Sequence, residues 1–191
     1  STTDLSCATL LIMRPDGMKY AIQQYFLPAD VLGQRVKEDK IPYDKWAERG
    51  LLTLCPGNKV DYSMVTAWYV RMLEECDIRP LWNGYDPWNS QYWIQEMQEH
   101  GFNMEVVRQG ARTLSQPMKE MAADLSAKKI NYNRNPILLW CLTNTQVKRD
   151  ENDNIRPVKG PSSRQRIDGT VSLLIAYTVL LNHLNDYKAL I

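Results

Sequence analysis

The chain has 191 residues, of which 44% are hydrophobic and 24% charged, and its formal net charge is +1 at pH 7. A chain of this length and composition forms a folded domain with its own core, which excludes a wholly disordered protein. The balanced charge excludes a uniformly basic nucleic-acid binder, although it leaves room for a local basic patch.

The first half of the chain predicts a β-hairpin followed by alternating helices and strands. Two apolar segments flank the turn sequence Arg-Pro-Asp-Gly at 14–17, which is a strong hairpin signal. Pro28 suits the first turn of a helix that Pro42 ends. Asp61 is a good cap for a helix with apolar residues at helical spacing. We expect strands at 5–13, 19–27 and 51–55, and helices at 29–40, 43–49 and 62–76.

The second half continues the alternation. Ser115 and Pro117 indicate a helix start, and the longest apolar run, 171–181, is about half of the roughly 20 residues that cross a bilayer, so we expect no membrane span. This order predicts an α/β fold with helices on both faces of a sheet. The expected elements are strands at 80–85 and 104–107, helices at 88–100, 115–128 and 168–187, an apolar stretch at 136–142, a hairpin of 145–149 with 155–158, and a mobile link at 159–165.

Side chains that commonly bind zinc or nucleotides are sparse. No pair of cysteines has CxxC spacing, so we expect reduced thiols and no structural zinc site. Glycine-rich phosphate loops of the GxxxxGK[ST] and GxGxxG types are absent, so no nucleotide is expected to bind this domain. The cysteines and histidines are Cys7, Cys55, Cys76, Cys141, His100 and His183.

Two aspartates stand where α/β sheets bind ligands, beyond the carboxyl ends of strands or at a helix start. Asp86 follows the predicted strand at 80–85, and Asp168 opens the last predicted helix. A helix cap is the simpler interpretation of each. If the two carboxylates meet, however, a divalent cation must offset their repulsion, and hard oxygen ligands suit Mg²⁺ or Mn²⁺. Two such ions about 3.5–4 Å apart support phosphodiester cleavage.

The segment 148–166 is locally basic, with six Lys and Arg residues against three acidic residues, or a net charge of +3. A hairpin joined to a flexible basic loop is suited to follow a phosphate backbone. A solvated surface hairpin is the alternative interpretation. The candidate DNA-binding residues are Lys148, Arg149, Arg156, Lys159, Arg164 and Arg166.

Several aromatic residues lie close to Asp86 in the sequence. Their spacing follows that of buried faces, whereas base-stacking platforms serve single-stranded nucleic acids. We therefore expect them to pack between helix and sheet. They are Trp82, Tyr85, Trp88, Tyr92 and Trp93.

The sequences Tyr-Asp-Pro-Trp-Asn at 85–89 and Arg-Ile-Asp-Gly at 166–169 resemble the nuclease domain of tailed-bacteriophage terminase large subunits, the DNA-packaging motors. The resemblance covers nearly the whole chain and implies a ribonuclease H-like α/β fold, with a mixed central sheet and helices on both faces. Further short segments match the family in the same order along the chain, at 25–28, 50–54, 56–58, 60–62, 108–110, 114–115, 135–136 and 144.

The resemblance also implies an endonuclease that cuts concatemeric double-stranded DNA with two Mg²⁺ or Mn²⁺ ions. By position, Asp86 and Asp168 match two of the metal-binding acids, and Asp4 matches a further acid of the family's opening motif. We take these three as catalytic candidates. The family's principal metal ligand, an aspartate on a central first strand, has no counterpart in the sequence, and full activity is expected to depend on it.

Residues 1–191 are thus interpreted as one terminase-type nuclease domain, the C-terminal part of a longer chain whose ATPase domain is absent. The resemblance implies double-stranded DNA, the terminase small subunit and the portal as partners, no membrane, and a location in the host cytoplasm. Two alternatives remain open. One is a non-catalytic DNA-gripping or portal-docking module in which the acids are helix caps. The other is a related ribonuclease H-like resolvase or integrase.

Overall fold

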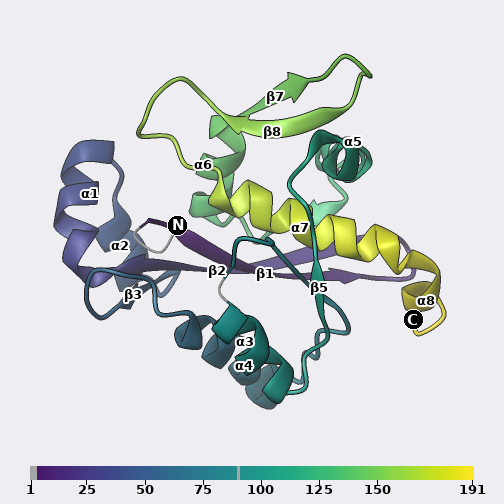
Figure 1. Ribbon diagram of the computed structural model, residues 1–191, viewed down its shortest axis with the longest axis horizontal. Coiled ribbons are helices and arrows are strands. Elements are labelled where there is room, and N and C mark those ends of the chain that lie inside the picture. The colour runs from purple at the N-terminus through teal and green to yellow at the C-terminus, as the bar shows by residue number, and fades with distance from the viewer. Residues whose placement is uncertain (1–3, 90) are drawn as a thin grey trace.

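The computed structural model describes residues 4–89 and 91–191, in which the strands form three separate sheets (Figure 1). The largest is built on an antiparallel hairpin of β1 (Ser6–Met13) and β2 (Lys19–Pro28). Gly17 closes the hairpin with a φ of 82° and donates its N–H to the Arg14 carbonyl, as the turn sequence predicts. On the other edge of β2, the short strands β3 (Leu52–Cys55) and β6 (Ile130–Asn131) both pair in parallel.

The second sheet is a parallel pair, β4 (Asn83–Tyr85) and β5 (Met104–Val106), joined by α4 (Gln91–Glu99). Within the described residues, β1 pairs with β2 alone and β4 with β5 alone. The other edges of β1 and β4 are therefore free of strand partners there, and residues of both strands line one large cavity.

Helices cover both faces of the β1–β2 hairpin, as expected. On one face, α7 (Asp168–Asn182) packs against β1, β2 and β4, with α5 (Ala111–Ser126) and α6 (Pro136–Asn144) beside it. On the other face, α3 (Tyr62–Cys76) and α4 pack against Ala8, Leu10 and Phe26. Alternate side chains of β1 point to opposite faces, since Leu11 belongs to the α5–α7 cluster. The mixed α/β class is thus confirmed.

Smaller elements complete the fold. A 3₁₀ turn η1 (Ala29–Val31), α1 (Leu32–Asp39) and α2 (Tyr43–Glu48) lie beyond β2. The hairpin of β7 (Thr145–Arg149) and β8 (Ile155–Lys159) packs on α5 through β8. The short helix α8 (Leu184–Lys188) ends the described fold. Within the residues described, no helix is long and apolar enough to cross a membrane.

Among the helix boundaries that differ from the sequence predictions, those of α5 and α7 differ most. Helix α5 begins at Ala111, four residues before the predicted start, with Gly110 as its N-cap. Ser115 does not cap it; its hydroxyl accepts the Ile155 N–H at 3.1 Å and so ties α5 to β8. The last helix is also shorter than predicted, because His183 has a non-helical φ of −114° and separates α7 from α8.

Candidate active site

Asp86 and Asp168 line the same cavity, whose volume is about 940 Å³. Its walls come from β1, the segment 80–86 and α7, with further side chains from α3 and α4. Burial raises the pKa of Tyr62, and the charges of Asp168 and Asp86 raise it further, so both carboxylates act on one group of the lining. The structure thus places the two predicted acids, from separate elements, in the lining of one cavity. Other polar lining residues include Asn89, Gln109 and Lys159.

Asp86 follows β4 directly and is half-buried. Its Oδ1 accepts the backbone N–H of Trp88 at 2.9 Å, which is a turn of the kind aspartate favours. Helix α4 begins only at Gln91, so this bond shapes the loop rather than the first turn of the helix. β4 itself lies close against α7, because a Cβ atom on Gly84 would meet Val179 and Ile175.

Asp168 is the first residue of α7, with Ile167 as the N-cap. Asp168 is therefore not the helix cap that the simpler interpretation predicted. Among the described residues, its buried Oδ2 has no hydrogen-bond partner. Burial raises the pKa of Asp168 to about 6; the charge of Lys159 lowers it and that of Asp4 raises it. A buried carboxylate oxygen without a partner is costly, and a cation in the cavity would remove that cost.

Two side chains of β2 fix the backbone next to Asp168. Gln23 is 8% exposed, and its Nε2 donates to the Gly169 carbonyl at 2.9 Å. Tyr25 is fully buried and donates from its hydroxyl to Gln23 Oε1 at 2.5 Å. Sequence reasoning missed these two residues. The available signal was a glutamine in the middle of a buried, largely apolar strand, where a polar side chain needs partners.

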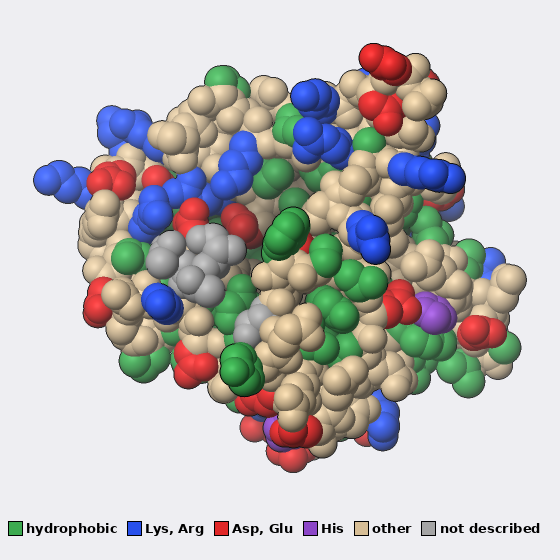
Figure 2. Space-filling view, in the orientation of Figure 1, with side chains coloured by type: hydrophobic (Ala, Val, Ile, Leu, Met, Phe, Trp, Pro, Cys, Tyr) green, Lys and Arg blue, Asp and Glu red, His purple; other side chains and the backbone are tan. Residues whose placement is uncertain are grey.

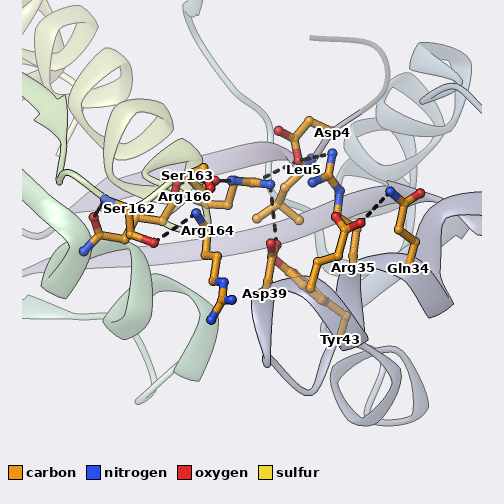
Figure 3. A network of polar contacts seen from close by, with 12 residues as sticks. Asp4, Leu5, Gln34, Arg35, Asp39, Tyr43, Ser162, Ser163, Arg164 and Arg166 are labelled. Carbon is orange, nitrogen blue, oxygen red and sulfur yellow. Dashed lines mark hydrogen bonds and ion pairs between the residues drawn. The ribbon is translucent and has the colours of Figure 1, made fainter.

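Asp4 lies in a network of ion pairs (Figure 3). Its Oδ1 accepts Arg166 Nε at 3.0 Å and lies 3.8 Å from Arg35 Nη2. Arg166 Nη2 lies 3.5 Å from Asp39 Oδ2, which also accepts the Tyr43 hydroxyl at 2.8 Å. As far as the described residues show, Asp4 does not line the cavity with Asp86 and Asp168. Its catalytic assignment stays a prediction.

The basic segment divides into exposed and buried residues. Arg166 is 4% exposed and pairs with Asp4 and Asp39, so its expected place on a DNA-binding surface is not what the structure shows. Lys148, Arg149, Lys159 and Arg164 are exposed and Arg156 is half-buried, while Lys159 also lines the cavity. Figure 2 shows Lys and Arg side chains gathered over the upper part of this face, with acidic side chains among them.

The aromatic residues near Asp86 do not all pack inward. Trp93 is 8% exposed and meets Tyr62 with ring centroids 5.6 Å apart. Trp88 and Tyr92, in contrast, are 91% and 87% exposed, so the expectation of buried packing is wrong for these two. Both follow Asp86 within six residues, and their rings face solvent.

The donor set suits a hard divalent cation. Among the described residues, no group of three or more His, Cys, Asp or Glu side chains is placed to hold a metal ion. The cavity nevertheless offers two carboxylates, and Asp168 Oδ2 lacks the partner that a cation would supply. Oxygen-only ligation of this kind is what Mg²⁺ prefers, with water and substrate completing its coordination.

Residues 1–183 match the family model described as "Terminase large subunit, endonuclease domain". The chain belongs to this terminase nuclease family. It is 25% identical over 175 residues to the terminase large subunit of Enterobacteria phage HK97, covering 91% of this chain and 34% of that protein. It is 30% identical over 141 residues to protein YmfN of Escherichia coli strain K12, covering 70% of this chain and 29% of that protein.

Solved terminase structures share the fold. The HK97 bacteriophage large terminase matches with a TM-score of 0.84 and 24% identity, over 93% of this chain and 37% of that chain. The large terminase nuclease from thermophilic phage G20c matches with a TM-score of 0.50 and 18% identity, over 63% of each chain. The ribonuclease H-like class expected from the resemblance is thereby confirmed. The domain spans about a third of the length of the curated relatives it matches.

Proposed function

We propose that this terminase nuclease domain is a Mg²⁺- or Mn²⁺-dependent endonuclease that cuts concatemeric double-stranded DNA. One observation carries the proposal. Asp86 and Asp168, from separate elements, line the same cavity, and Asp168 has a buried carboxylate oxygen without a partner in the described chain. Membership of the family supports a nuclease, and the donor set supports the metal.

When two divalent ions are bound, they supply charge stabilisation at the scissile phosphate and activation of the attacking water. The residues of the chain would bind the ions and the DNA. Asp86 and Asp168 would hold the ions, and the positive charge of Lys159 favours the ionised form of Asp168. Lys148, Arg149, Arg156, Lys159 and Arg164 bind the DNA backbone by charge. Asp4, two residues before β1, is a further candidate that would act if the network with Arg166 opens.

We further propose that the domain works within a longer motor chain with an ATPase domain, together with the small subunit and the portal, in the host cytoplasm. The share of the relatives' length that the domain spans supports this proposal. A non-catalytic DNA-gripping module is the second candidate, because Asp86 does make a turn bond to the Trp88 N–H.

Cleavage of supercoiled plasmid in Mn²⁺ tests the proposal. Asp86→Ala and Asp168→Ala should abolish cutting, and the chelator EDTA should stop the unaltered protein. Asp61→Ala is the matched control, since Asp61 also accepts a backbone N–H two residues on, at 3.0 Å, but caps α3 and does not line the cavity. It should cut at the normal rate.

Two results would count against the proposal. Undiminished cutting by either cavity variant removes that residue from the mechanism. An unaltered protein that leaves DNA intact and gains no thermal stability from Mn²⁺ has no metal-dependent nuclease function, which favours the gripping module. Cleavage of branched DNA in preference to linear duplex would instead favour a resolvase.

A further inference from the structure

Gln109 places an unpartnered amide donor in the cavity of Asp86 and Asp168, whose lining also includes the unpartnered atoms Asp168 Oδ2 and Trp93 Nε1. It lies in the short connection between β5 and α5 and lines the same cavity. Its Nε2 is buried and, within the described residues, has no hydrogen-bond partner. Buried amide donors are almost always satisfied in native proteins, so this one calls for an acceptor that the described chain does not provide.

The backbone holds Gln109 close to Asp86. Val107, two residues before Gln109, is 2% exposed and donates its N–H to the Tyr85 carbonyl at 2.8 Å. Tyr85 is the residue directly before Asp86. Gly110, on the other side of Gln109, is the N-cap of α5. The side chain therefore projects from a connection that is fixed at both ends, beside the strand β4 that Asp86 follows.

The unpartnered atoms of Asp168 and Gln109 are opposite in character, and Trp93 Nε1 is a further donor of the lining. Asp168 Oδ2 accepts and requires a cation or a donor, whereas Gln109 Nε2 donates and requires an acceptor. A bare cation would leave Gln109 unsatisfied, and a bare anion would be repelled by Asp168. A phosphodiester oxygen paired with a divalent cation satisfies both groups at once, because it presents a positive charge to the carboxylates and a negative oxygen to the amide.

We propose that Gln109 is a phosphate-binding residue whose Nε2 donates to a nonbridging oxygen of the DNA strand held at Asp86 and Asp168. This inference rests on the proposed nuclease function and adds a specific contact to it. The amide orients the phosphate group but does not hold the metal, and its partner is present only when DNA is bound.

Three measurements on Gln109→Ala separate this role from others. The catalytic efficiency kcat/KM for duplex cleavage should fall by about tenfold or more, the loss expected for a hydrogen bond to a charged group. The gain in Tm on adding Mn²⁺ without DNA should stay unchanged. The Tm of the metal-free protein should not fall, because Nε2 has no partner to lose, whereas a structural role would lower it.

Two further variants sharpen the test. Gln109→Glu replaces the donor by a carboxylate, so kcat/KM should fall at least as far as with alanine while binding of Mn²⁺ is retained. Gln116→Ala is the matched control, because Gln116 is exposed on α5 and donates to Glu120; its cleavage kinetics should be normal.

The outcomes distinguish the two levels of the proposal. Normal kcat/KM in Gln109→Ala, with the unaltered protein cutting DNA, overturns the role of Gln109 and leaves the nuclease intact. Loss of the Mn²⁺-induced gain in Tm in Gln109→Ala also overturns it, since the residue would then hold the metal. Absence of cutting and of any response to Mn²⁺ in the unaltered protein means that the proposed function itself has failed.

Discussion

The hydroxyl group of Tyr25 occupies the space in which residue 169 would carry a Cβ atom, so only glycine fits directly after Asp168. The same hydroxyl donates to Gln23, and Gln23 donates to the Gly169 carbonyl. Two side chains of β2 thus fix the first turn of α7. The position of Asp168 in the cavity depends on a close contact between a strand and a helix that lie far apart in the sequence.

Gly169→Ala should lower the free energy of unfolding by about 1–3 kcal/mol, because the added methyl group must displace a buried tyrosine. Denaturant unfolding measures the loss. Gly33→Ala is the control, since a Cβ atom there meets open space within α1 and alanine favours the helix. Equal losses in both variants would show that the contact with Tyr25 is not tight.

Asp168→Asn should make the metal-free protein more stable at pH 7.5. In the folded protein burial raises the pKa of Asp168 to about 6, above the roughly 3.9 of an unfolded aspartate. Between these values the folded state binds more protons, so the free energy of unfolding falls as the pH rises.

Above pH 6 the charged carboxylate of Asp168 lowers the free energy of unfolding by its full amount, about 1–3 kcal/mol. The asparagine variant does not have this loss. The two proteins should have similar stability near pH 4. Urea unfolding in EDTA across this pH range measures the difference. A variant that is less stable than the unaltered protein at pH 7.5 would contradict the burial of the charge.

Arg166→Ala should destabilise the fold by about 3 kcal/mol or more, because it leaves the buried Asp39 without its cation and Asp4 with only the longer contact to Arg35. Arg149→Ala removes an ion pair of similar length on the surface, with Asp153 at 2.6 Å, and should cost less than about 1 kcal/mol. Thermal or urea unfolding compares them. If both variants lose little stability, Arg166 is not held in a buried ion-pair network and becomes again a candidate for a surface contact with DNA.

Lys159→Ala and Arg164→Ala should each weaken binding to duplex DNA and reduce the slope of log affinity against log salt by about one. Fluorescence anisotropy at several salt concentrations measures the slope. Lys45→Ala is the control, because Lys45 lies on α2 and pairs with Glu48. An unchanged slope in both the Lys159 and the Arg164 variant would remove the basic segment from the DNA-binding surface.

Local signals were enough to predict much of the fold. The turn at 14–17 predicted the β1–β2 hairpin, Asp61 predicted the start of α3, and the apolar run predicted α7. These features are set by neighbouring residues, through turn conformation, capping and periodicity. The same local reasoning failed for α5, because Ser115 bonds to Ile155, forty residues away.

The sequence indicated that Asp86 and Asp168 could share one site, and both line one cavity; their role stays a prediction, and their surroundings were not predicted. Asp86 and Asp168 follow from their places after a strand and at a helix start. The burial of Arg166 was not predictable from residues 148–166, because a basic residue beside a link rich in Gly and Ser is expected to face solvent. Its partners, Asp4 and Asp39, come from distant parts of the chain. In the described residues, β1 and β4 belong to different sheets. Which strands pair depends on residues far apart in the chain, so no local sequence pattern predicts it.

A crystal of this protein soaked in Mn²⁺, with anomalous scattering used to locate the ions, tests the metal site most directly. We expect a peak in the cavity within about 2.0–2.6 Å of a carboxylate oxygen of Asp86 and of Asp168 Oδ2, the range for oxygen ligands of hard cations. Ordered Mn²⁺ elsewhere, with both aspartates left without an ion at millimolar metal, would contradict the proposed nuclease centre.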